Sequence, residues 1–240
     1  MKCKSVLGAL TVALSMTMVT NASAFGLPKI GGSALGLPET GSSDKPAVSG
    51  SPETMDSVLT QQDSLVKTYQ SSLRDILSSQ ALLLEAYGMK EEAAKLRSEA
   101  EALAKGPLDK EQFSIITRMS ERIDRRINAL IDKQKALTDE GRKKYLQALL
   151  PYATGVAQMA KLAPELKSFL KSASGQLKSA SLMEKAKVME KLDVGMYLAK
   201  ASPGYLSNVA STTKKVVTYA KKQGVSKKTA DDALKMLSRL

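Results

Sequence analysis

The sequence predicts an all-α protein: an elongated antiparallel helical bundle built on two long heptad-patterned helices, with a flexible N-terminal leader and a basic helical C-terminal half. Composition is the first reason, because Ala, Leu, Lys, Glu and Ser are frequent, aromatic residues make up 4% and Trp is absent. No long alternation of Val, Ile and Thr, typical of strands, occurs. The other two reasons are two long stretches with apolar residues at alternating steps of four and three.

The first stretch, residues 55–87, carries an unbroken heptad pattern. Its seam positions are Met55, Leu59, Gln62, Val66, Tyr69, Leu73, Ile76, Gln80, Leu83 and Tyr87. Ser51 and Pro52 suit the N-cap and the first helical position, and Gly88 predicts a bend or break. Such a helix is about 50 Å long and cannot bury its apolar face alone.

The second stretch begins at Asp109 and Gln112, which are spaced like a capping box. Its seam positions are Phe113, Ile116, Ser120, Ile123, Ile127, Leu130, Gln134 and Leu137. We expect the two long helices to pair with each other, so that residues 51–140 form a long-helix hairpin core. Between them, residues 89–104 predict a shorter amphipathic helix.

Both seams contain Gln or Ser, and polar seam residues fix the register of paired helices at some cost in stability. A register role, or a place at a solvent-facing end, is favoured over the lining of a polar cavity. Away from the second seam, four arginines alternate with two acids: Arg118, Arg122, Arg125 and Arg126 with Glu121 and Asp124. This favours a solvated, salt-bridged face over an anion-binding stripe.

Residues 1–24 are typical of a cleaved secretory signal peptide. Lys2 and Lys4 precede a largely apolar run that is too short to span a bilayer comfortably, and an A-x-A cleavage pattern ends at Ala24. We therefore expect cleavage after Ala24 and a periplasmic or secreted protein. Residues 25–50 are rich in Gly, Ser and Pro and predict a flexible leader.

Residues 141–240 predict several shorter helices, packed on the core as one domain. Pro151 is expected to end one helix, and Pro164 to bend or start the next. Two further helices are expected over residues 204–222 and 227–238.

The residue inventory excludes much catalytic chemistry. The chain has no His, and its one Cys, Cys3, lies in the predicted signal peptide. Disulfides, thiolate nucleophiles, Ser-His-Asp triads and the usual zinc, haem and iron–sulfur ligand sets are thereby excluded. No phosphate loop or nucleotide-binding fingerprint occurs. We expect a non-enzyme with no cofactor and no metal.

Charge is distributed unevenly along the chain. Residues 25–140 contain 15 basic and 18 acidic residues, whereas residues 141–240 contain 19 basic and 6 acidic residues, a net charge of +13. Such a surface attracts polyanions at long range. The candidate anion- or membrane-binding residues are Lys143, Lys144, Lys187, Lys214, Lys215, Lys221, Lys222, Lys227 and Lys228.

Lysine outnumbers arginine 17 to 2 in this half, and lysine is poor at the bidentate recognition of base edges. Nucleic acid is therefore not the expected partner. The expected partner is an anionic lipid, lipopolysaccharide or an envelope protein. Solubility, together with docking on the acidic half, is an equally weighted explanation of the charge. Four tyrosines lie among the lysines, and a core role is favoured for them over a membrane interface: Tyr152, Tyr197, Tyr205 and Tyr219.

These observations predict an exported, non-enzymatic helical-bundle protein that acts as a binding or structural factor of the bacterial envelope. Its basic C-terminal half is expected to contact an anionic surface or a protein partner. The alternative is a secreted helical toxin or membrane-active protein, although no apolar hairpin long enough to enter a bilayer occurs. Oligomerisation through the heptad seams is a further expectation.

Overall fold

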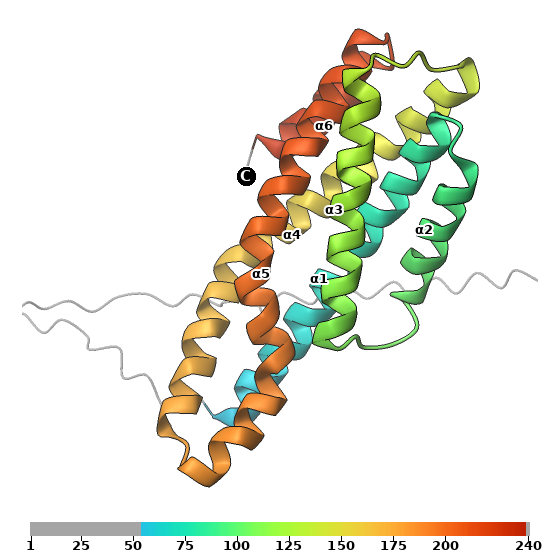
Figure 1. Cartoon of the computed structure of the whole chain (residues 1–240). Helices are drawn as coiled ribbons and strands as arrows, with labels where there is room; N and C mark the ends of the chain where they lie inside the picture. Colours follow the sequence, from blue (N-terminus) through green and yellow to red (C-terminus); the bar gives the residue numbers. More distant parts are fainter. Residues whose placement is uncertain (1–53, 239–240) are drawn as a thin grey trace, which may run out of the picture. The chain divides into compact units, whose positions relative to one another are not determined.

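The computed structural model describes residues 54–238. Six helices lie within that range (Figure 1): α1 (Met55–Ala86), α2 (Lys90–Ala102), α3 (Lys110–Asp132), α4 (Asp139–Ser179), α5 (Leu182–Lys222) and α6 (Lys227–Leu237). No strand occurs among these residues, which confirms the prediction of an all-α bundle. The predicted signal peptide, the predicted leader, and Ser51 and Pro52 lie outside the described residues.

The ends of the first three helices follow local chemistry. Thr54 caps α1 by accepting a hydrogen bond from the amide of Ser57 at 3.3 Å. Gly88, at a φ of 80°, turns the chain into α2, because glycine adopts the left-handed region without steric cost. The capping box of α3 is present, with the amide of Gln112 donating to Asp109 Oδ1 at 2.8 Å.

The two heptad helices, α1 and α3, are not each other's main partner, so the expected hairpin of these two helices is wrong. Tyr69 packs edge-on against Phe113, with ring centroids 5.7 Å apart, and Gln80 reaches Ser120 farther along both helices. Residue numbers rise together at these contacts, so α1 and α3 run in the same direction. The intervening α2 returns the chain between them.

The main partner of α1 is α4. The two helices run antiparallel, because Gly141 lies against Ala86 and Gly155 lies against Ser72. Gly141, Ala148 and Gly155 are buried on α4 at intervals of seven residues, which places them on one face. A Cβ added at Gly155 would lie 2.9 Å from the carbonyl oxygen of Ser72 on α1. Small residues therefore allow the two helix backbones to approach closely, which larger seam residues on α3 do not.

Helices α4 and α5 are longer than expected, because prolines lie inside them rather than at their ends. Pro151 and Pro164 lie within α4, and Pro203 lies within α5. All three prolines are exposed, so water reaches the side of the helix where a hydrogen bond is lost. The buried side of α4, which includes Tyr152 and Leu166, packs against the core and holds the helix together where a backbone hydrogen bond is missing.

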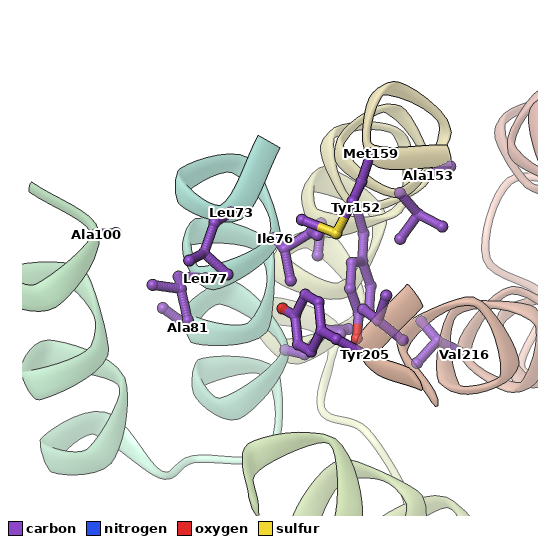
Figure 2. Packing of buried hydrophobic residues seen from close by; sticks show 14 of the residues in the cluster. Leu73, Ile76, Leu77, Ala81, Ala100, Tyr152, Ala153, Met159, Tyr205 and Val216 are labelled. Atoms are coloured by element: carbon purple, nitrogen blue, oxygen red, sulfur yellow. The ribbon is translucent and has the colours of Figure 1, made fainter. Parts of the chain in front are cut away.

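The core is formed where α1, α4 and α5 meet. Figure 2 shows Ile76 of α1 beside Tyr152 of α4 and Tyr205 of α5. Tyr152, Tyr205 and Tyr219 are buried, which confirms the core interpretation for these three tyrosines, whereas Tyr197 is half-buried.

Candidate anion-binding site and a buried polar cluster

Three tyrosines fix one end of the bundle. Tyr145 donates a hydrogen bond to the carbonyl oxygen of Val216 at 3.0 Å, and Tyr219 donates to that of Lys135 at 2.8 Å. The ring of Tyr145 also contacts Tyr87, with centroids 6.1 Å apart, and Tyr219, at 5.9 Å. These contacts bring together the start of α4, the end of α5 and the connection that precedes α4.

Eight of the nine predicted lysines lie on the segments that meet there. We call these segments, residues 142–144, 214–222 and 227–228, the lysine-rich end. The eight lysines are Lys143, Lys144, Lys214, Lys215, Lys221, Lys222, Lys227 and Lys228. The start of α6 joins them because it follows α5 after a short connection (Figure 1).

Lys187 does not belong to this group. It lies near the start of α5, whereas Lys222 is the last residue of that helix. At 1.5 Å per residue, the two are about 50 Å apart. The nine predicted residues therefore do not form a single surface.

Three lysines of the lysine-rich end are paired with carboxylates. Lys144 lies 3.3 Å from Glu85, Lys215 lies 2.6 Å from Asp132, and Lys221 lies 2.5 Å from Asp231. The first two pairs join the basic half of the chain to the acidic half, as the docking explanation of the charge expected.

The pKa values of two of these carboxyl groups respond to the pairing. Hydrogen bonding from Arg97 and, second, from Lys144 lowers the pKa of Glu85. The Lys221 hydrogen bond lowers the pKa of Asp231. Both carboxyl groups therefore keep their negative charge to a lower pH than usual.

Five lysines remain available for an external anion. They are exposed and, within the described part of the chain, form no ion pair: Lys143, Lys214, Lys222, Lys227 and Lys228. Lys214 and Lys222 line a groove of about 680 Å³ between the end of α3 and α5, together with Lys215 and Asp132. The groove therefore presents three ammonium groups and one carboxylate.

Lys227 and Lys228 occupy the first turn of α6, which contains no acidic residue. A cation there opposes the helix dipole, at a cost of about 0.3–1 kcal/mol each at an exposed site. The helix dipole therefore does not favour these two lysines at this position. Their charge adds to the positive end of the dipole and strengthens the attraction of an anion.

A second group of polar residues lies in the interior, one side chain or two from each of four helices. We call it the buried polar cluster: Gln80 of α1, Ser120 and Asp124 of α3, Tyr152 of α4 and Tyr205 of α5. None of the five is more than 3% exposed. A substrate in solution therefore has no access to these groups.

The cluster is joined by hydrogen bonds. Gln80 Nε2 donates to Asp124 Oδ1 at 2.7 Å and to Ser120 Oγ at 2.9 Å. Ser120 Oγ lies 2.7 Å from Tyr205 Oη, and Tyr152 donates to Asp124 Oδ1. The polar seam residues Gln80 and Ser120 thus meet other polar groups in the interior rather than at a solvent-facing end. Their interhelical hydrogen bond is consistent with the predicted role in fixing the register of the helices.

Asp124 corrects the predicted solvated face of α3. The four arginines of that face are exposed as expected, but Asp124 is only 3% exposed. The reason is position: Asp124 follows Ser120 by four residues and Thr117 by seven, so it shares their buried side. The spacing was visible in the sequence, but the charge of Asp124 argued for the surface.

Burial governs the electrostatics of the cluster. Loss of hydration raises the pKa of Asp124 to about 7, against hydrogen bonds from Tyr152 and Gln80 that lower it. The neighbouring charges act less, Glu121 raising and Arg125 lowering the pKa. Asp124 Oδ2 has no hydrogen-bond partner among the described residues, so a negative charge there is poorly compensated.

No helix of residues 54–238 has the length and apolar character needed to cross a membrane. Nor does the described part of the chain bring three or more potential metal-ligating side chains together. Comparison of the chain with protein-family models, curated proteins and solved structures yields no match.

Proposed function

We propose that this chain is an exported, non-enzymatic binding factor of the bacterial envelope that contacts an anionic surface through its lysine-rich end. The observation that carries the proposal is the convergence of eight lysines from three separate segments on one end of the bundle. Export is supported by the signal-like pattern of residues 1–24.

The chemistry of the surface favours a particular kind of anion. Lysine ammonium groups are hydrated point charges, suited to phosphate or carboxylate groups spread over a surface rather than to one bidentate ligand. Five of them form no ion pair within residues 54–238, and two lie at a helix N-terminus, where the helix dipole disfavours a cation. Phosphorylated lipid head groups or the phosphates of lipopolysaccharide match this arrangement.

Retention on a column of immobilised heparin tests the proposal. Heparin is a polyanion and contains no lipid, so the column reports on charge and not on insertion into a bilayer. One variant replaces the five unpaired lysines by Gln: Lys143, Lys214, Lys222, Lys227 and Lys228. A matched control replaces five exposed lysines elsewhere, with the same change in net charge: Lys90, Lys95, Lys105, Lys161 and Lys200.

The first variant is expected to elute at markedly lower salt than the control, because clustered charges act within a Debye length of about 10 Å. Circular dichroism of both variants checks that the helices are retained. Equal elution of the two variants would show that net charge alone drives retention and would contradict the proposal.

A further inference from the structure

The turn between α4 and α5 exposes apolar side chains. Leu182 and Met183, the first two residues of α5, are each 88% exposed. Met189, two turns later, is 54% exposed. Figure 1 shows this turn projecting at the end of the α4–α5 hairpin. We call residues 178–191 the hairpin tip.

We propose that the hairpin tip docks on an anionic lipid membrane, with Leu182 and Met183 inserted among the lipids and neighbouring lysines at the head groups. This contact is additional to the proposed function. Helix α5 has 41 residues, so its two ends are about 60 Å apart at 1.5 Å per residue. The hairpin tip is therefore a surface separate from the lysine-rich end.

The turn itself does not require the two apolar side chains. Its conformation is fixed by Ser181 and Glu184, which form a capping box: the amide of Ser181 donates to Glu184 Oε2 at 3.2 Å and its hydroxyl donates at 2.7 Å. Leu182 and Met183 take no part in these bonds. Their exposure to water is unfavourable and is relieved only when something apolar covers them.

The charges around the two side chains complement an anionic surface. Lys178, Lys185, Lys187 and Lys191 of the hairpin tip are exposed, against the carboxylates of Glu184 and Glu190. The Glu184 carboxylate is occupied by Ser181, and these hydrogen bonds lower its pKa. Lysines beside an inserted apolar residue can keep their ammonium groups at the level of the lipid phosphates. Lys187, the one predicted lysine outside the lysine-rich end, is thus part of the hairpin tip.

The size and shape of the patch favour a membrane over a folded partner. A standard protein interface takes about 20–30 residues from each side, whereas the exposed large apolar side chains here are Leu182, Met183 and Met189. A small apolar projection ringed by lysines suits shallow insertion into a head-group layer, where apolar area and attraction to anionic lipid act together.

The absence of Trp from the chain provides a clean reporter. Leu182→Trp places the sole Trp in the hairpin tip, and Ile115→Trp places it at a 59% exposed position on α3 as a matched control. Fluorescence is recorded with vesicles of phosphatidylglycerol and phosphatidylethanolamine, with and without brominated acyl chains. The Trp of L182W should shift to the blue and be quenched by the bromines, while that of I115W should do neither.

Three results would overturn the inference: absence of vesicle binding, unchanged L182W emission on bound vesicles, or L182W emission already blue-shifted without vesicles. The last would mean that another part of the protein covers the hairpin tip. A second variant, Leu182→Ser with Met183→Ser, should bind vesicles at least about tenfold more weakly, as expected for the loss of two buried apolar side chains. Its retention on heparin should be unchanged.

The two proposals can therefore fail separately. If the five-lysine variant and its control elute from heparin at the same salt concentration while the Trp of L182W inserts into vesicles, only the proposed function is wrong. If heparin retention responds to those lysines while L182W stays in water, only the hairpin-tip inference is wrong.

Discussion

Tyr152 of α4 donates its phenolic hydrogen bond to Asp124 of α3, at a site that is closed to water. Gln80 of α1 donates to the same carboxylate oxygen, and Tyr205 of α5 joins through Ser120. A single buried acid thus ties together helices that the sequence separates widely. Its protonation state should be visible in the stability of the whole bundle.

The first prediction concerns pH. Because burial raises the pKa of Asp124 to about 7, the folded protein holds this proton more tightly than the unfolded chain, whose Asp pKa is about 4. The contribution to the free energy of unfolding is therefore fully present below about pH 4 and is lost as the pH rises through about 7, with a slope of up to about 1.4 kcal/mol per pH unit.

Asp124→Asn isolates this contribution, since Asn is uncharged and its Oδ1 can accept from Tyr152 and Gln80 in the same way. Urea unfolding of both proteins should give a stability difference that moves in favour of Asn between pH 5 and pH 8. A difference that is constant over this range would mean that Asp124 does not titrate there.

The second prediction concerns the hydrogen bond itself. Tyr152→Phe removes the donor but keeps the ring, so it should lower the free energy of unfolding by about 1–3 kcal/mol, because the carboxyl oxygen of Asp124 loses one of its buried donors. It should also raise the pKa of Asp124 further, because the Tyr152 hydrogen bond favours the ionised form. If the variant were as stable as the original protein, the bond would have little energetic role.

The third prediction concerns the close approach of α1 and α4. Gly155→Ala should lower the free energy of unfolding by about 1–3 kcal/mol, because its Cβ meets the Ser72 backbone and the helices must separate. Gly175→Ala, also within α4, has no atom within 4 Å of the added Cβ. This control should instead stabilise the protein by about 0.5–1 kcal/mol through helix propensity. Stabilisation by both substitutions would contradict the close packing.

Sequence periodicity and capping chemistry predicted the helical class, the end of α1 and the start of α3, whereas α1 begins at Met55 with Thr54 as its N-cap and not at Pro52. The capping box at Asp109 and the end of α1 near Gly88 depend on local interactions, which are legible in a single sequence. The predicted second seam runs past the end of the helix, since α3 ends at Asp132 and the predicted seam residue Gln134 lies in the following connection with a φ of 49°.

Partner choice could not be predicted from the large apolar residues alone. The determinant is the repeat of small residues at Gly141, Ala148 and Gly155. A pattern defined by large apolar side chains does not include these residues. The prediction that Pro151 ends a helix was wrong for a similar reason. Tertiary packing outweighs the local cost of Pro151 and Pro164, so both lie inside α4. The charge count predicted that residues 141–240 carry the basic surface. That Lys187 lies far from the other eight lysines could be seen only once the length of α5 was known.

Lysine footprinting tests the central claim most directly. The protein is acetylated briefly with and without heparin at low salt, and each modified lysine is quantified by mass spectrometry. Contact through the lysine-rich end predicts protection of Lys214, Lys222 and Lys227, while the exposed Lys95 and Lys161 react unchanged. Protection spread evenly over all these lysines, or centred on Lys95 and Lys161, would contradict it.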